Sequence, residues 1–151
     1  MDKSEKPFVL LVEDNEPTCT LMTALLHKDF AIDVASDGME AIEKLRTKSY
    51  GTVILDLIMP HLDGYGVLDF LKANNPEMLR RILVVTAALS PSDLSRIRGY
   101  DVCALISKPF EVETLLNAVK QCTSDPASRR GRILSSGVIL LLADLLRQRF
   151  M

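Results

Sequence analysis

The residues that could do chemistry in this chain are, first, carboxylates that follow short apolar runs. Glu13 and Asp14 come directly after one such run, and Asp56 comes directly after another. If the runs are parallel strands of one sheet, the carboxylates gather at one edge, where they would repel each other unless a cation supplied compensating charge. Oxygen ligands without histidine or thiolate favour Mg²⁺, which phosphate oxygens can complete. We therefore expect Asp14 and Asp56 to bind Mg²⁺ directly, and Glu13 to bind it directly or through water.

Two further polar side chains, Thr86 and Lys108, follow apolar runs in the same way. A carboxylate can attack phosphorus, and phosphoryl transfer needs mainly positioning and neutralisation of the transferred oxygens. In that chemistry Asp56 is the candidate nucleophile. The Lys108 ammonium would face the transferred group, and the Thr86 hydroxyl would donate to another phosphoryl oxygen. Alone, Thr86 could equally be a strand-end hydroxyl that bonds to backbone, but the whole set indicates one site.

Five apolar runs rich in valine, isoleucine and leucine have to position these side chains. Each run has the length of a buried strand, and stretches with helical spacing lie between and after the runs. Strands that alternate with helices require crossover connections, which predicts an α/β fold with a doubly wound, five-stranded parallel sheet. Ligands of such sheets bind outside the carboxyl ends of the strands. The expected strands are Phe8–Val12, Phe30–Val34, Thr52–Leu55, Ile82–Val85 and Val102–Ile106.

Four segments carry a resemblance to a known family. VEDN, LDLIMPHLDG, VVTA and SKPF occur in the order and spacing of the signatures of response-regulator receiver domains, which are CheY-like proteins of two-component phosphorelays. The resemblance covers about residues 7–122 and implies the flavodoxin-like strand order 2-1-3-4-5. It implies a cytoplasmic signalling protein, not an enzyme, that accepts a phosphoryl group on Asp56 from a histidine kinase or phosphotransfer protein. Weak self-phosphorylation and dephosphorylation are expected with it.

The resemblance also implies roles for individual residues. Glu13 and Asp14 match the acidic pair of the family, and Ile58 matches the residue whose backbone carbonyl binds the metal. Thr86 and Lys108 match the phosphate-sensing pair. With Asp56, these residues form the expected Mg²⁺ and phosphoryl site.

Three other positions bear on how the domain would be built and how it would signal. Pro109 matches a proline that follows a cis peptide bond, and Gly64 matches a glycine needed for backbone conformation at a turn. A face at about residues 90–121 would bind a downstream protein. The family commonly has an aromatic residue three positions before the lysine, where this chain has Leu105, so we expect altered or weakened coupling to that face.

Composition narrows the function classes. Residues 1–125 carry 13 basic and 19 acidic side chains, a net charge of −6, so the body has no basic footprint for nucleic acid, and direct nucleic-acid binding is not expected. The three cysteines are odd in number and widely spaced, which indicates neither a disulfide framework nor a zinc site and favours a reducing cytoplasm. No apolar run is long enough for a signal peptide or a membrane helix.

The C-terminal part differs from the rest of the chain. We expect the receiver domain to span residues 7–123, a polar linker to span 124–132, and an apolar C-terminal helix to span 133–151. The last 26 residues carry 5 basic and 1 acidic side chains. An apolar helix of this kind should dock somewhere. It could pack on its own domain or form a homodimer, and it could equally bind a partner, continue a linker or lie on a membrane surface.

Two other function classes stay open beside the phosphoacceptor. A phosphatase that uses the same aspartyl-phosphate chemistry would carry DxD at the nucleophile, but position 58 is isoleucine, so its general acid is missing. A phosphorylation-independent interaction module with the same fold ranks second: Leu105 and the C-terminal segment favour it, and the complete acidic pocket disfavours it.

Overall fold

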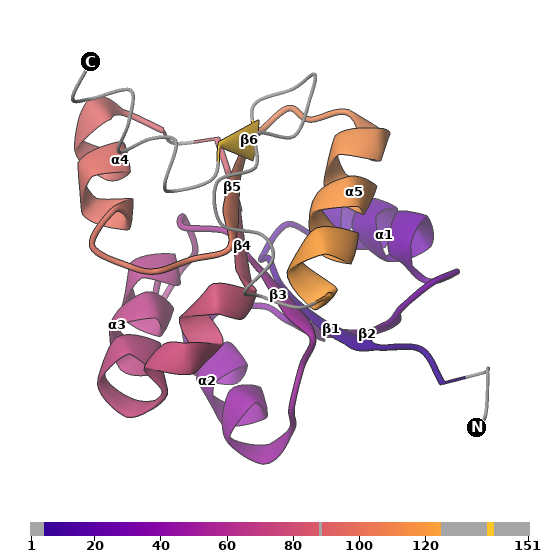
Figure 1. Cartoon of the computed structure of the whole chain (residues 1–151), viewed down its shortest axis with the longest axis horizontal. Coiled ribbons are helices and arrows are strands. Elements are labelled where there is room, and N and C mark those ends of the chain that lie inside the picture. Colours follow the sequence, from indigo (N-terminus) through magenta and orange to yellow (C-terminus); the bar gives the residue numbers. More distant parts are fainter. Residues whose placement is uncertain (1–4, 88, 125–138, 141–151) are drawn as a thin grey trace.

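The structure, a computed structural model, describes residues 5–87, 89–124 and 139–140. Strands and helices alternate along the chain (Figure 1), and a short 3-10 helix, η1, precedes the fourth strand. The elements are β1 (Phe8–Val12), α1 (Glu16–Leu26), β2 (Ala31–Ala35), α2 (Gly38–Thr47), β3 (Thr52–Leu55), α3 (Gly64–Asn74), η1 (Pro76–Arg81), β4 (Ile82–Thr86), α4 (Pro91–Ile97), β5 (Ala104–Ser107), α5 (Val112–Thr123) and β6 (Ile139–Leu140).

Five parallel strands form the body of the sheet in the order β2-β1-β3-β4-β5. The predicted α/β class and the strand order 2-1-3-4-5 are therefore confirmed. The first strand, β1, lies inside the sheet, and the second, β2, forms one edge. The third strand, β3, then pairs with β1 on the side opposite β2. This reversal places the carboxyl ends of β1 and β3 side by side, at the point where doubly wound sheets bind ligands.

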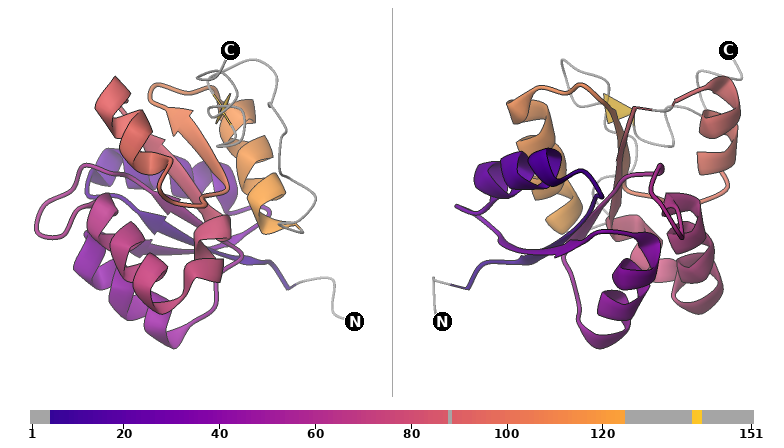
Figure 2. Two further views of the ribbon diagram at one scale, coloured as in Figure 1. Left: turned by 60° about the vertical axis from the view of Figure 1, so that its left-hand side comes forward. Right: turned by 180° about the vertical axis from the view of Figure 1, so that it is seen from behind.

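Helices cover both faces of the sheet. α1 and α5 lie on one face and α2, α3 and α4 on the other, as Figure 1 and the view from behind in Figure 2 show. β1 contributes to both buried clusters: Leu10 packs under α2 and α3, whereas Leu11 packs under α1 and α5. Because alternate side chains enter opposite cores, the inner strands β1, β3 and β4 are almost wholly apolar, as the sequence predicted.

Side-chain caps fix where several helices begin. Asp37 accepts a hydrogen bond from the Glu40 N–H at the start of α2, and Asp63 accepts one from the Gly66 N–H at the start of α3. Asn15 caps α1 in the same manner. These bonds satisfy N–H groups that have no partner inside a helix. The loops that carry the candidate site residues are thereby held between a strand end and a capped helix.

The C-terminal prediction is corrected at two residues. Ile139 and Leu140 form the strand β6, which pairs antiparallel with β5 in the registers Ile106↔Ile139 and Leu105↔Leu140. These two residues are therefore not helical. The reason is that β5 would otherwise present unpaired N–H and C=O groups at the edge of the sheet, and an extended segment can pair with them. The remainder of the expected helix 133–151, and residues 125–132 of the expected linker, lie outside the described residues.

The expectation that the cysteines form no disulfide was also wrong. Cys103, just before β5, is bonded to Cys122 in the last turn of α5, and Cys19 remains a thiol. The pair is 19 residues apart in sequence, a spacing that matches no recognised motif, and only the packing of α5 onto the sheet brings it together. Within the described part of the chain, no helix is long and apolar enough to cross a membrane.

Candidate functional site

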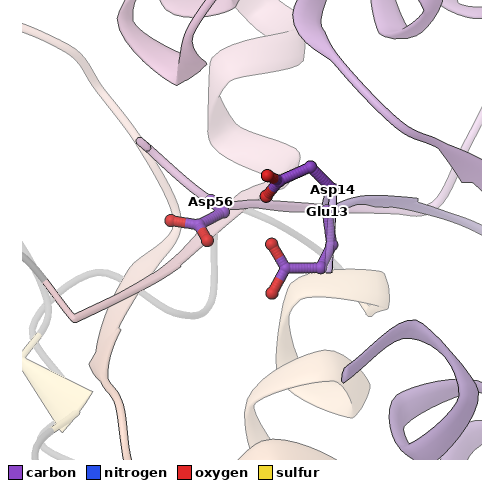
Figure 3. Close-up of side chains that lie close together, drawn as sticks. All are labelled: Glu13, Asp14 and Asp56. Atoms are coloured by element: carbon purple, nitrogen blue, oxygen red, sulfur yellow. The ribbon is translucent and has the colours of Figure 1, made fainter. Parts of the chain in front are cut away.

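Three carboxylates meet at the carboxyl ends of β1 and β3. Glu13, Asp14 and Asp56 each offer an oxygen, and these oxygens lie within 4.8 Å of one another. Figure 3 shows the three side chains side by side. Glu13 is 3% and Asp56 9% exposed, whereas Asp14 faces solvent. The sequence therefore predicted correctly that these carboxylates gather, and the structure adds that they differ in access to water.

The backbone positions the two buried carboxylates by extending the sheet beyond the strands. The Asp56 N–H donates to the Val12 carbonyl at 3.1 Å, and the Glu13 N–H donates to the Ala35 carbonyl at 3.0 Å. Two residues after Asp56, the Ile58 N–H donates to Asp56 Oδ1 at 3.1 Å. The Asp56 side chain is therefore held from the strand side and from the following loop, which leaves Oδ2 to face the other charged groups.

Lys108 brings the compensating positive charge. Its Nζ lies 2.6 Å from Glu13 Oε1 and 3.0 Å from Asp56 Oδ2. The Lys108 N–H donates to the Thr86 carbonyl at 3.0 Å, which continues the β4–β5 pairing past the strand ends. The Lys108–Pro109 peptide bond is cis, as the resemblance implied. Lys108 is thus brought to the carboxylates from the far side of β4.

The electrostatics of the site are those of a crowded, partly buried charge cluster. Burial, together with hydrogen bonding to Asp56, raises the pKa of Glu13 to about 7. Burial opposes ionisation of Asp56 as well, but hydrogen bonds from Glu13, Lys108 and the Ile58 N–H outweigh it and lower the pKa of Asp56. Burial would lower the pKa of Lys108, yet its bonds to both carboxylates raise it. Asp56 is therefore the anionic member of the buried pair, as a nucleophile must be.

Thr86 and Gly64 complete the surroundings of the carboxylates. Thr86 ends β4, is fully buried, and lies in register with Ser107 of β5. Gly64 lies so close to the phosphoacceptor loop that an added Cβ would stand 2.4 Å from the Asp56 carbonyl oxygen and 2.7 Å from Leu57 Cα. The need for glycine at this position is therefore a close backbone approach, which differs from the conformational reason that the resemblance implied.

The residues present fit a hard divalent cation. Within the described residues, Glu13 Oε2 is a buried side-chain oxygen without a hydrogen-bond partner, and an oxygen in that state is costly unless something binds it. The clustered ligand atoms are all carboxylate oxygens, the donor type that Mg²⁺ prefers. Glu13, Asp14 and Asp56 would hold such an ion. The Ile58 carbonyl as a fourth ligand remains a prediction.

This fold, with acidic residues at the carboxyl ends of β1 and β3, is that of a receiver domain. A family model of the response regulator receiver domain matches residues 9–120. The chain belongs to that family, as the four sequence signatures indicated. Receiver domains of response regulators are signalling modules of two-component systems. The chain is therefore a signalling module of this kind.

Relatives of the chain include longer regulatory proteins. It is 34% identical over 115 residues to the regulatory protein VanRB of Enterococcus faecalis, which covers 74% of this chain and 50% of that protein. It is 29% identical over 153 residues to the transcription factor SKN7 of Chaetomium thermophilum, which covers 96% of this chain and 19% of that protein. The chain thus spans half or less of the length of these relatives.

Solved structures share the fold. The receiver domain of a sensor histidine kinase from Pseudomonas aeruginosa, crystallised with a magnesium ion coordinated in its active-site cleft, has a TM-score of 0.72 and 23% identity, covering 80% of this chain and 100% of that one. The chemotaxis protein CheY4 of Vibrio cholerae has a TM-score of 0.71 and 24% identity, covering 78% of this chain and 99% of that one. These likenesses show the fold.

Two features near the site were not predicted from the sequence. One is the direct contact of Lys108 with Glu13, because a sequence does not reveal which carboxylate a long flexible side chain will reach. The other is a link between α3 and α4, in which the Tyr65 hydroxyl donates to Asp93 Oδ1 at 2.7 Å. Asp93 also closes the capping box of Ser90 at the start of α4. The capping pattern is readable in the sequence, but its tyrosine partner is not.

Proposed function

We propose that Asp56 accepts a phosphoryl group in a Mg²⁺-dependent reaction and that the resulting aspartyl phosphate changes the protein-binding face of the domain. The observation that carries the proposal is the position of Asp56. Its carboxylate lies beside an acidic pair suited to a divalent cation and also contacts the Lys108 ammonium, with Asp56 Oδ2 to Lys108 Nζ at 3.0 Å. A bound Mg²⁺ would supply positive charge against the phosphoryl oxygens.

The chain's own groups have defined tasks in the transfer. An Asp56 carboxylate oxygen attacks phosphorus, a new P–O bond forms, and the bond from phosphorus to the donor's leaving atom breaks. The leaving group departs with the electron pair of that bond. Lys108 exchanges a carboxylate contact for a phosphoryl oxygen, and the Thr86 hydroxyl donates to another phosphoryl oxygen. The Ile58 N–H remains on the Asp56 carboxyl group and fixes its orientation.

The donor that fits this chemistry is the phosphohistidine of a sensor histidine kinase or of a phosphotransfer protein, in the cytoplasm. Its imidazole is a good leaving group once it is protonated, and a receiver of this kind turns over slowly because its product is a modified residue. Small-molecule acyl phosphates also carry a transferable phosphoryl group, and there the bond that breaks is P–O, with a carboxylate as the leaving group. The domain therefore works as a signalling acceptor with weak self-phosphorylation and dephosphorylation, not as a multiple-turnover enzyme.

The response would pass from Thr86 to the surface at about residues 90–121. Leu105 stands at the position where the family commonly carries an aromatic side chain. It is 2% exposed and is buried in the core cluster that also contains Tyr65 and Ile97. Compared with an aromatic side chain such as tyrosine, leucine has a smaller surface and no hydroxyl. It therefore has fewer interactions with which to favour one of two conformations of the binding face. We expect a smaller population shift at this face, which would bind a downstream protein.

Intact-mass spectrometry after incubation with acetyl phosphate and Mg²⁺ tests the proposal. The expected result is a single added group of about 80 Da, which fits one aspartyl phosphate, absent in EDTA and absent in Asp56→Asn. Asp63→Asn is the matched control, since it makes the same change in the same loop and asparagine also caps helices well. An adduct that survives Asp56→Asn, or no adduct on the unaltered protein, contradicts the proposal.

The alternative, an interaction module that works without phosphorylation, is less well supported. Such a module has no need for a buried carboxylate oxygen that lacks a partner, yet Glu13 Oε2 is in this state, at a cost to stability. The interaction module would be the better supported function only if the mass experiment gave no adduct on a protein that was still folded.

A further inference from the structure

We propose that Cys103 and Cys122 form a reversible redox modification site, a dithiol–disulfide pair that exchanges with low-molecular-weight disulfides of the glutathione type. The two residues are bonded, with their Cα atoms 6.0 Å apart. This proposal does not depend on the phosphoacceptor function.

The backbone places the two cysteines at a junction of two elements. The Cys103 N–H donates to the Ile82 carbonyl at 2.9 Å, which fixes Cys103 at the amino end of β5 beside β4. Cys122 lies in the last turn of α5, on the face that packs against the sheet, and belongs to the buried cluster under α1 and α5. Because both positions are set by the sheet and its helix cover, the thiols would stay close together after reduction.

The two sulfurs differ in access, and this asymmetry is what exchange chemistry needs. Cys122 is 1% exposed, whereas Cys103 is only half-buried. An external thiol or disulfide therefore reaches Cys103 first, and Cys122 acts from inside the protein as the resolving residue. Cys19 lies in α1, and within the described residues it is a thiol without a disulfide partner.

The reaction balances without any further reactant. In oxidation, the Cys103 thiolate attacks one sulfur of RSSR, a mixed disulfide forms at Cys103, and RS⁻ leaves and takes up a proton. The Cys122 thiolate then attacks the Cys103 sulfur, the intramolecular bond forms, and the second RSH leaves. Two thiols of the protein are oxidised and one disulfide is reduced to two thiols. Reduction is the reverse sequence.

The pair is separated from the phosphoacceptor site. Cys103 precedes β5 at its amino end, whereas Lys108 follows β5 at its carboxyl end, where the carboxylates gather. The end of α5 has a second anchor, since the Thr123 hydroxyl lies 2.7 Å from the Thr52 hydroxyl of β3. Reduction should therefore leave the fold and the acidic pocket intact.

The disulfide closes a loop that contains β5, the Lys108–Pro109 peptide and most of α5. Cross-linking a loop of this size restricts mainly the unfolded chain. We expect the oxidised protein to melt about 5–10 °C above the reduced protein. We also expect slower amide exchange at 119–124, around the end of α5. Oxidation would thus set how firmly the last turn of α5 is held, in a compartment where disulfides are otherwise transient.

The full chain is equilibrated in anaerobic buffers that cover a series of ratios of reduced to oxidised glutathione. Each sample is quenched with acid and alkylated with a maleimide, and the number of alkylated thiols is counted by intact-mass spectrometry. The expected result is a transition from three alkylated cysteines to one, reversed by dithiothreitol. Cys19→Ser should shift the count to two and zero at the same midpoint. In Cys122→Ala, a glutathione adduct should accumulate at Cys103, because the resolving thiol is gone.

Two results overturn the proposal. Three alkylated thiols at every ratio would mean that the cysteines do not form a disulfide. One alkylated thiol at every ratio, including excess reductant in the native state, would mean a permanent structural disulfide. The count is made on unaltered protein, so neither result depends on whether a variant folds. Acetyl phosphate uptake, measured on the same samples, should be equal in both redox forms.

Discussion

Lys108 Nζ lies 2.6 Å from Glu13 Oε1, closer than its 3.0 Å to Asp56 Oδ2. The two residues are 95 positions apart in the sequence, so this contact joins the first and last strands of the parallel sheet in chain order. With no phosphoryl group present, the lysine is thus engaged by the carboxylates. A phosphoryl group on Asp56 would compete with both carboxylates for this ammonium.

Lys108→Met should destabilise the domain. Removing the ammonium leaves the buried carboxylates without their cation, and breaking such a pair from one side costs about 3 kcal/mol. Urea unfolding in EDTA at neutral pH measures the loss, and added Mg²⁺ should restore part of it. Lys44→Met is the control, because the Lys44–Glu40 pair is 3.9 Å apart and at the surface, where a pair contributes less than ~1 kcal/mol. Equal losses in the two variants would contradict the account.

Gly64→Ala should be far more disruptive than Gly99→Ala. A Cβ at Gly64 would meet the Asp56 carbonyl oxygen at 2.4 Å, whereas the nearest contact for a Cβ at Gly99 is the Arg96 carbonyl oxygen at 3.3 Å. Overpacking against fixed backbone costs roughly 1–3 kcal/mol, and the displaced loop carries the phosphoacceptor. We expect Gly64→Ala to lower the urea midpoint and to slow phosphoryl uptake from acetyl phosphate. Normal uptake in Gly64→Ala would show that the loop tolerates the shift.

Tyr65→Phe should loosen the start of α4 specifically. The change removes only the hydroxyl that donates to Asp93 Oδ1 at 2.7 Å, and a hydrogen bond to an ionised carboxylate is stronger than one between neutral groups. Hydrogen exchange should accelerate at 91–97. Tyr100→Phe is the matched control, since the Tyr100 hydroxyl bonds to the Asp69 carboxylate on α3 beyond the other end of α4. Identical exchange profiles for the two variants would rule out a specific link between Tyr65 and the α4 cap.

Asp33→Asn should lower stability at neutral pH and lose its effect in acid. A hydrogen bond from Tyr50, with help from Lys48, lowers the pKa of Asp33 below its ordinary 3.8. A lowered carboxyl pKa means that the stabilisation is present above 3.8 and is lost as pH falls through the folded-state value. We expect a difference of about 1–2 kcal/mol at pH 7.

Urea midpoints of Asp33→Asn and the unaltered protein, compared at a series of pH values, test this. The difference should shrink as pH falls from 3.8 through the lower folded-state pKa of Asp33, and Asp29→Asn, at an exposed carboxylate, should show little effect throughout. A difference that stays constant into acid would mean that the Asp33 charge is not its source.

The sequence predicted those features that depend on local pattern. Apolar runs of strand length, each followed by a polar residue, placed Asp56 and Thr86 at one edge of the sheet, because parallel strands end at the same edge. It did not predict the Cys103–Cys122 bond, the pairing of β6 with β5, or the choice of Glu13 by Lys108. Each of these joins segments whose proximity is created by packing, and no spacing rule along the chain encodes it.

Locating the phosphoryl group in the chain tests whether Asp56 is the phosphoacceptor. Borohydride reduces an acyl phosphate to an alcohol, so a phosphorylated aspartate becomes homoserine while free carboxylates are unchanged. After treatment with acetyl phosphate and Mg²⁺, tryptic residues 49–72 contain Asp56, Asp63 and Asp69, and fragment ions distinguish them. We predict homoserine at position 56, and none in EDTA. Homoserine at position 63 or 69, or reduction of Glu13 or Asp14 in tryptic residues 4–28 instead, would contradict the assignment of Asp56 as the phosphoacceptor.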